Sequence, residues 1–270
     1  QGNIMLFWEI ILYSLVQGIT EFLPISSSAH LLILEKLLSW PIPGRTTAIA
    51  AHLGSLFAVL LYLKGDIISI LRSIFKLENY FQNNNIKTLK NIIVITIPII
   101  LVGLFIFKNF DDKLLTLNVI AWSSIIGATL LFISDKFKIK EKNISSLSFL
   151  ECLFIGILQV FALIPGASRS GTIITAARIL NIQRIEAAKL GLYTSIPVIL
   201  GAVTLESIWL INNVSNITNY LYIVITCIMS FIFAYLSIIF LMKWLKTKNF
   251  APFILYRILL GLTILIIFNN

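Results

Sequence analysis

Three ionisable side chains, Glu21, His30 and Arg169, lie inside otherwise apolar segments of the chain. Burying such groups is costly, so they usually mark a site that binds or transforms something. The alternative is a structural lock in which the three side chains pair with one another. Pairing and function are compatible, and the neighbouring residues indicate which chemistry is involved.

The run 165–171 reads Pro-Gly-Ala-Ser-Arg-Ser-Gly and suits an anion. Gly166 and Gly171 allow successive backbone N–H groups to point inward as a nest. A helix that begins near Ser170 would direct its positive end toward the same place. The guanidinium of Arg169 adds a planar fork that matches phosphate oxygens. The predicted phosphate-binding residues in this run are Gly166, Ser168, Arg169 and Ser170.

The run 17–30 offers complementary groups. Gln17 and Glu21 are four residues apart and therefore share one face of a helix. One carboxylate and one neutral oxygen are too few for a closed metal cage. They suit Mg²⁺ or Ca²⁺ shared with substrate phosphates and water. Gln17 and Glu21 are therefore the predicted metal ligands.

Three serines and His30 complete this run. His30 follows Ser27 by three residues and Ser26 by four, so the imidazole would reach either hydroxyl within a helix. A hydroxyl beside an imidazole is the arrangement of an activated nucleophile. The simpler interpretation is that Ser26, Ser27 and Ser28 cap a helix. Ser27 is the first candidate for a nucleophile or a phosphate-orienting hydroxyl, and Ser26 is the second.

We interpret the other polar residues in apolar runs as structural rather than catalytic. His52, beside Gly54, is interpreted as a hydrogen-bonded packing residue. Arg178 and Arg257 are expected either to reach the membrane interface or to pair with a buried acid such as Glu206.

The composition indicates which elements must position these residues. Of the 270 residues, 58% are hydrophobic and only 12% are charged, and the mean hydropathy is +0.95. Soluble domains average about 45–50% apolar and about 25% charged residues. This composition excludes a disordered chain, a basic nucleic-acid-binding protein and an ordinary soluble enzyme. Cys152 and Cys227 both lie in apolar runs, which argues against a disulfide framework or a cysteine-ligated metal. The predicted fold class is that of an all-α integral membrane protein.

Eight apolar segments divide into two kinds. A spanning helix needs about 20 mainly apolar residues, and six runs come close: 47–64, 91–107, 117–134, 187–205, 220–242 and 253–268. The segments 4–38 and 149–180 have polar centres and short apolar flanks. We predict that each forms a re-entrant helix–loop–helix hairpin, because irregular backbone at membrane depth is tolerated only inside protein or beside a watery cavity.

The two hairpins begin two similar halves, about 4–135 and 149–270, of a single membrane domain that spans 1–270. Pro24 is followed by Ser27 as Pro165 is followed by Ser168, and the separation between halves falls from 141 at the prolines to 134 at Gly127 and Gly261. Each half holds one hairpin and three spans. Because three is odd, the second half must be inverted relative to the first, as in many transporters.

The basic residues predict the orientation. Loops on one side of this topology carry far more Lys and Arg than loops on the other, and such loops usually face the cytoplasm. Both termini and the opening of the first hairpin are then expected on the outer face. Of the 21 basic residues, fourteen lie on the cytoplasmic side, namely Lys64, Arg72, Lys76, Lys87, Lys90, Lys136, Lys138, Lys140, Lys142, Arg184, Lys189, Lys243, Lys246 and Lys248, against Lys36, Arg45, Lys108 and Lys113 outside.

A family resemblance joins these observations. The chain resembles the bacterial undecaprenyl-diphosphate phosphatases, a family associated with bacitracin resistance, over nearly its whole length. Two runs are similar to the signature motifs of that family: Gln17-x-x-x-Glu21-x-x-Pro24-x-Ser26-Ser27-x-x-His30 and Pro165-Gly166-x-Ser168-Arg169-Ser170-Gly171. The first position of the first motif accepts Glu or Gln. Gln17 therefore leaves Glu21 as the principal carboxylate.

The resemblance implies an enzyme of the inner, cytoplasmic membrane of a bacterium. It would remove the terminal phosphate of a C55 polyprenyl diphosphate on the outer face, with a divalent cation, and return undecaprenyl phosphate to cell-wall synthesis. Glu21, Ser27, His30 and Arg169 are then the expected catalytic residues, with His30 as general base or acid. Ser26 joins the expected phosphate-binding residues. The sequence leaves open whether Ser27 forms a phosphoserine or water attacks directly.

Two other functions compete with the phosphatase. A transporter or flippase of polyprenyl phosphate lipids is the alternative, because hairpins that meet at the midplane are typical of transporters. A lipid-binding scaffold would leave the costly ionisable residues unexplained. The expected partners are the lipid substrate and membrane lipids, with a homodimer left open and no nucleic acid.

Overall fold

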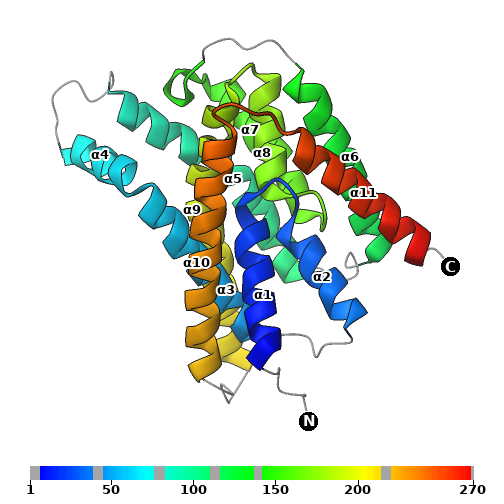
Figure 1. The fold of residues 1–270 in the computed structure, drawn as a ribbon. Coiled ribbons are helices and arrows are strands. Elements are labelled where there is room, and N and C mark those ends of the chain that lie inside the picture. The colour runs from blue at the N-terminus through cyan, green and yellow to red at the C-terminus, as the bar shows by residue number, and fades with distance from the viewer. Residues whose placement is uncertain are drawn as a thin grey trace.

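The computed structural model describes residues 7–38, 45–75, 83–109, 116–136, 142–213 and 220–268. These residues are helical apart from turns and one isolated bridge between Lys142 and Ile182 (Figure 1). The helices are α1 (Phe7–Phe22), α2 (Ser27–Leu37), α3 (Arg45–Tyr62), α4 (Lys64–Phe75), α5 (Asn84–Asn109), α6 (Leu117–Asp135), η1 (Ile144–Ser146), α7 (Phe149–Val160), η2 (Phe161–Leu163), α8 (Arg169–Ile179), α9 (Arg184–Asn213), α10 (Tyr220–Trp244) and α11 (Ala251–Phe268).

Five of these helices, α5, α6, α9, α10 and α11, are long and apolar enough to cross a membrane. The bent pair α3 and α4 adds a sixth candidate, with an angle of 72° between Thr46–Tyr62 and Lys64–Phe75. The prediction of an all-α membrane protein is confirmed. Five of the six apolar runs lie within one of these helices, and the run 47–64 follows α3 and reaches the first residue of α4. After the predicted span 47–64, α4 continues the chain as a helix.

The remaining helices form two short hairpins. α2 and α8 have 11 residues each, too few to cross a membrane. In Figure 1, α1 and α2 lie below their connection whereas α7 and α8 lie above theirs. The two connections meet inside the molecule, where the hydroxyl of Ser170 donates a hydrogen bond to the carbonyl of Leu23 at 2.9 Å.

The two connections have the same local geometry. Ser26 precedes α2 with φ 74° and Ser168 precedes α8 with φ 69°, the left-handed region that few non-glycine residues adopt. The hydroxyls of Ser26 and Ser28 lie 3.2 Å apart, as do those of Ser168 and Ser170. The structure therefore matches Ser26 with Ser168, one residue away from the predicted match of Ser27 with Ser168.

Close helix packing surrounds the hairpins. α10 lies against both α3 and α1, and α11 lies against α6. Gly54 makes the first approach possible, because a Cβ atom there would stand 2.2 Å from the carbonyl oxygen of Cys227. The main core cluster joins residues from both hairpins and from the long helices around them.

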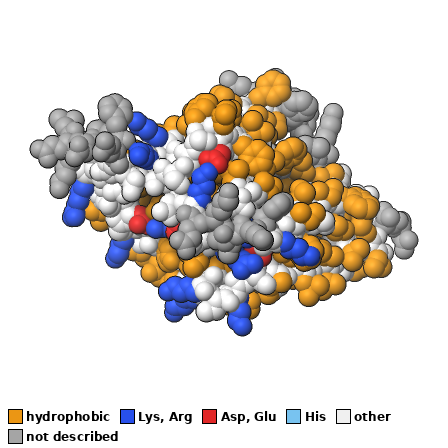
Figure 2. Space-filling view, turned by 90° about the horizontal axis from the view of Figure 1, so that it is seen from above, with side chains coloured by type: hydrophobic (Ala, Val, Ile, Leu, Met, Phe, Trp, Pro, Cys, Tyr) orange, Lys and Arg blue, Asp and Glu red, His pale blue; other side chains and the backbone are white. Residues whose placement is uncertain are grey.

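Lys and Arg side chains are spread over the upper end of the molecule, while apolar side chains cover the flank beside it (Figure 2). Four of the basic residues used for the orientation lie outside the described residues: Lys76, Lys113, Lys138 and Lys140. The same holds for the first six and the last two residues of the chain.

Candidate active site

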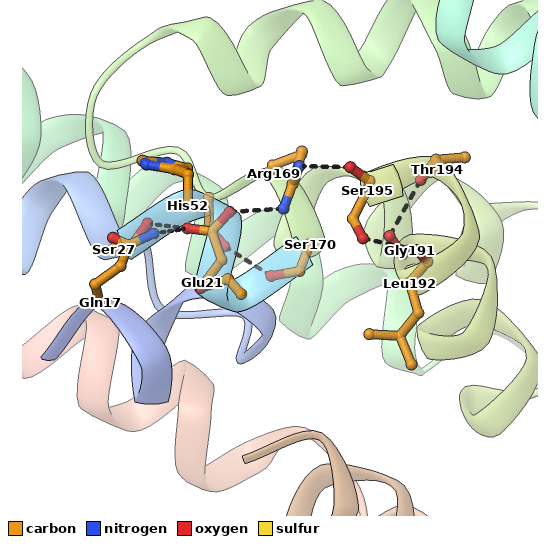
Figure 3. Close-up of polar contacts among 12 residues, drawn as sticks. Gln17, Glu21, Ser27, His52, Arg169, Ser170, Gly191, Leu192, Thr194 and Ser195 are labelled. Atoms are coloured by element: carbon orange, nitrogen blue, oxygen red, sulfur yellow. Dashed lines mark hydrogen bonds and ion pairs between the residues drawn. The ribbon is translucent and has the colours of Figure 1, made fainter. Parts of the chain in front are cut away.

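The carboxylate of Glu21 is the centre of a polar cluster between the two hairpins (Figure 3). Its Oε2 atom accepts hydrogen bonds from the hydroxyl of Ser27 at 2.6 Å and from Nε2 of Gln17 at 2.9 Å. Its Oε1 atom accepts from Nη2 of Arg169 at 2.7 Å. The Glu21 and Arg169 side chains are 8% and 13% exposed. The structure thus brings these four predicted site residues together in a protected place.

The starts of two helices deliver Ser27 and Arg169 to this carboxylate. Each is the first residue of its helix and follows a serine with positive φ. The first N–H groups of a helix have no carbonyl partner within it, so both helix starts present donors. In α8, the hydroxyl of Ser168 accepts one of these, the N–H of Gly171, at 3.2 Å. The N–H groups of Arg169 and Ser170 come before Gly171 in α8, so this cap does not use them.

A cavity of about 320 Å³ opens beside the cluster. Its polar side contains Glu21, Ser27 and Arg169 together with further hydroxyls and an imidazole. Its other side is apolar and comes from α5, η2 and α9. The lining residues are Glu21, Ser26, Ser27, Ser28, His52, Ile99, Ala162, Leu163, Pro165, Ser168, Arg169, Val198, Ile199 and Ala202. The cavity therefore offers a polar and an apolar wall side by side, as an amphipathic ligand would need.

Two predicted phosphate-binding residues lie outside this lining. Gly166, with φ 93°, faces α6, and a Cβ atom there would stand 2.2 Å from Oγ of Ser123. Its carbonyl accepts a hydrogen bond from Nη2 of Arg257 at 3.1 Å. The hydroxyl of Ser170 donates a hydrogen bond to the backbone carbonyl of Leu23. Gly166 therefore packs closely against α6, and its role in binding phosphate stays a prediction.

His30 also faces away from the cavity. Its Nδ1 lies 2.6 Å from the backbone carbonyl of Ser26 and its Nε2 lies 2.6 Å from Oη of Tyr256, with the two rings stacked. The predicted contact between this imidazole and a serine hydroxyl is wrong. The hydroxyl of Ser27 donates to Glu21 instead, because the turn points Ser27 toward α1 and His30 toward α11.

The cavity instead contains His52, which sequence reasoning missed. Its Nδ1 is 2.8 Å from the carbonyl oxygen of Ala48, one turn earlier in α3. The interpretation as a hydrogen-bonded residue is correct, yet the ring also lines the cavity with Glu21 and Arg169. The available signal was the one that selected Glu21, an ionisable side chain within an apolar run.

Arg257 is fully buried and supports the second turn. Its Nη2 donates to the carbonyls of Gly166 at 3.1 Å and Ala167 at 2.8 Å. The expectation that it reaches an interface is wrong, because α6 and α8 enclose it. Arg178 is also buried, and it pairs with Asp135 rather than reaching an interface.

Few oxygen atoms beside Glu21 could bind a cation, but the side-chain oxygen of Gln17 is available to do so. Oε1 of Gln17 is buried without a hydrogen-bond partner among the described residues. No group of three or more His, Cys, Asp or Glu side chains in those residues could hold a metal by itself. Glu21 and Gln17 therefore fit a hard cation only together with oxygen atoms from a ligand or water.

Residues 10–263 match the family described as Bacitracin resistance protein BacA. The chain belongs to this family. An undecaprenyl-diphosphatase of Pelagibacter ubique is 36% identical over 264 residues, which cover 97% of this chain and 98% of that protein. An undecaprenyl-diphosphatase of Alcanivorax borkumensis is 36% identical over 260 residues, 96% and 98% of the two chains. A third, from Alteromonas mediterranea, is 35% identical over 265 residues, 97% and 98%.

The BacA match covers both hairpins and the long helices except for the first residues of α1 and the last residues of α11. The polar cluster of Glu21, Ser27 and Arg169 is therefore part of the shared region rather than of an added segment.

Proposed function

We propose that this chain is an undecaprenyl-diphosphate phosphatase, a hydrolase that converts undecaprenyl diphosphate to undecaprenyl phosphate and inorganic phosphate. The observation that carries the proposal is the contact of Glu21 with Ser27 and Arg169 beside a cavity that has an apolar wall. An acid, a hydroxyl and a guanidinium are the groups that phosphoryl transfer needs, and an isoprenoid needs the apolar wall. The full-length similarity to three undecaprenyl-diphosphatases supports the same substrate.

Arg169 is the proposed phosphate clamp. Its guanidinium donates to Glu21 and, at 3.4 Å, to the carbonyl of Ser195, which fixes its plane at the cavity. Two parallel N–H groups match two phosphate oxygens. The N–H groups at the start of α8 point to the same place and stabilise negative charge. Charge that develops on the transferred phosphoryl group would meet donors that are already in position.

Glu21 and Ser27 are the proposed reacting pair. The 2.6 Å hydrogen bond from Ser27 to Glu21 gives the hydroxyl a proton acceptor. In one route Ser27 attacks the terminal phosphorus and water then hydrolyses the phosphoserine. In the other, Ser27 orients the phosphate while Glu21 accepts a proton from an attacking water. In both, the anhydride bond breaks and the bridging oxygen leaves with undecaprenyl phosphate.

A divalent cation fits beside this pair. Glu21 and the open Oε1 of Gln17 would hold Mg²⁺ or Ca²⁺ together with phosphate and water oxygens. When bound, such an ion would neutralise phosphate charge and polarise the phosphoryl oxygens.

His30 is proposed as a positioning residue. It links the Ser26 carbonyl to the hydroxyl of Tyr256 and so fixes the turn from which Ser27 projects. This role replaces the general base expected from spacing alone, because both ring nitrogens already have partners.

The two hairpins are proposed to be re-entrant and to begin the two halves, about 4–135 and 149–270, of an inverted repeat in a bacterial inner membrane. Their opposite directions in Figure 1 and their matching serine turns support the repeat. The basic upper end supports a cytoplasmic location for that end. The first hairpin would then open to the outer face, where the diphosphate would be met.

The deciding experiment measures phosphate release from undecaprenyl diphosphate by purified protein in detergent, with Mg²⁺ or Ca²⁺ and with a chelator. We expect turnover that the chelator abolishes. Glu21→Gln should lower kcat/KM by about 10³-fold or more, because it removes the proton acceptor of Ser27. Glu35→Gln, on the same hairpin but outside the cavity lining, is the matched control. A wild-type protein that releases no phosphate with any divalent ion would contradict the enzyme and favour a polyprenyl-phosphate flippase.

A further inference from the structure

Arg257 is a buried cation that pairs with no acidic side chain among the described residues. Its Nη2 atom donates to the carbonyls of Gly166 at 3.1 Å and Ala167 at 2.8 Å. Its Nε and Nη1 atoms are buried without a hydrogen-bond partner in that part of the chain. An unpaired buried charge is costly, so it usually serves a function. The cavity lining does not include Arg257, so any effect on a ligand there must pass through the second turn.

Three successive carbonyls of the second turn are held from the side of α6 and α11. Hydroxyl groups of α6 donate to the carbonyls of Pro165 at 2.5 Å and Gly166 at 3.3 Å. Arg257 of α11 donates to those of Gly166 and Ala167. In a planar trans peptide the N–H group points opposite to the carbonyl. The N–H of Ser168 shares a peptide with the carbonyl of Ala167, and it therefore points away from Arg257.

The other side of this peptide is the cavity. Ser168 lines the cavity, whereas Ala167 lines a separate groove between α6 and α8. No hydrogen bond from the N–H of Ser168 is found among the described residues. Arg169, the next residue, points toward Glu21 in Figure 3 and contacts it at 2.7 Å. The second turn thus presents an unused N–H donor where the phosphate is proposed to bind.

We propose that the N–H of Ser168 donates a hydrogen bond to an oxygen of the transferred phosphoryl group, and that Arg257 is the positioning residue that orients this N–H. The inference rests on the proposed function and adds one donor and its support to the same site. The contact of Arg257 with the Ala167 carbonyl fixes the plane of the peptide, and its charge polarises the peptide so that the N–H becomes a stronger donor. Charge that develops on the phosphoryl oxygen then meets a donor that is already oriented.

The sequence Ala-Ser occurs once in the chain, at 167–168, so the N–H of Ser168 can be observed alone. Full-length protein in detergent, labelled with carbonyl-¹³C alanine and ¹⁵N serine, gives a single amide signal in a carbonyl-filtered NMR spectrum. The titrant is methylenediphosphonate, a diphosphate that cannot be hydrolysed, with Mg²⁺. We expect the amide proton to shift downfield on binding, because it enters a hydrogen bond to a charged oxygen. An unshifted signal while calorimetry shows binding, or no binding by wild type, would overturn the inference.

Turnover of undecaprenyl diphosphate tests the role of Arg257. Arg257→Gln keeps a donor for the carbonyls but loses the charge. It should lower kcat by about 10- to 100-fold, less than the loss of a direct donor, with a smaller change in KM. Arg257→Lys keeps the charge and should stay within about ten-fold of wild type in kcat. The control is Arg178→Gln, which breaks a buried ion pair of α8 outside the cavity lining. It should lower the midpoint of thermal unfolding and leave kcat of the folded protein unchanged.

The downfield shift of the Ser168 amide should also be smaller in Arg257→Gln than in wild type. An Arg257→Gln protein with the kcat of wild type, or with a loss no larger than that of Arg178→Gln, would overturn the inference. Should Arg257→Gln fail to fold, Arg257→Lys decides, because a kcat more than about ten-fold below wild type would show that the charge is not what acts. A wild-type protein that shows the amide shift but releases no phosphate would contradict the proposed function alone.

Discussion

The turns of the two hairpins have nearly the same backbone and opposite chemistry. Ser27 and Arg169 are equivalent first residues of α2 and α8, and both reach the same carboxylate. Gln17 and Gln159 are also equivalent, 142 residues apart, and both are fully buried. The position that matches Glu21 in the second half is Leu163, which lines the cavity. The two turns therefore provide a symmetric frame, and unequal side chains turn it into a site.

Neighbouring residues of α11 support the two turns in different ways. Tyr256 holds the first turn through the imidazole of His30. Arg257 holds the second turn through the carbonyls of Gly166 and Ala167. One tilted helix thereby fixes both turns relative to each other. The first support is a single side-chain contact, whereas the second is part of a buried network, so the two should differ in how much they contribute to stability.

The largest effect is expected where the turns differ most in chemistry. Arg169→Lys keeps a positive charge but loses the planar fork that contacts Glu21 and Ser195. We expect kcat/KM for phosphate release to fall by about 10²- to 10³-fold, comparable to the loss of one preorganised donor. An Arg169→Lys protein whose kcat/KM lies within about three-fold of wild type would mean that a positive charge alone is sufficient for this activity.

A large effect on stability is expected at the second turn. Gly166→Ala places a Cβ atom 2.2 Å from Oγ of Ser123 at a residue with φ 93°. The expected loss is about 2–5 kcal/mol from backbone strain and overpacking, measured as a lower midpoint of thermal unfolding in detergent. Gly65→Ala, in α4 with nothing within 4 Å of its Cβ position, is the control and should not lose stability. Equal midpoints for the two variants would show that the second turn adapts.

The smallest effect is expected at the first turn. Tyr256→Phe removes the hydroxyl that contacts Nε2 of His30 but keeps the ring stacking. We expect a loss of about 0.5–1.5 kcal/mol in stability, typical of one hydrogen bond, and a modest fall in kcat/KM. Tyr220→Phe, at an exposed position at the start of α10, should change neither quantity. A drop as large as that of Glu21→Gln would restore His30 to the chemical step.

Much of this architecture was predictable from the sequence. Long apolar runs specify the spanning helices, because only helices satisfy the backbone in lipid, and the cost of burying Glu21 and Arg169 selects them. Side-chain direction was not predictable. Spacing places His30 near two hydroxyls, but the positive φ of Ser26 turns it toward α11. Spacing also gives no reason to bring His52 to the cavity, since that depends on how α3 packs against α10.

The central claim is that groups from the two turns act as one site. It is tested most directly by a double-mutant cycle on kcat/KM for phosphate release, using Glu21→Gln, Arg169→Met and the combined variant. Because the two side chains form one contact at 2.7 Å, their effects should be strongly non-additive. We predict that kcat/KM of the double variant lies within about three-fold of that of the less active single variant, as for residues that act as a unit. A double variant whose loss equals the product of the two single losses would contradict a shared site.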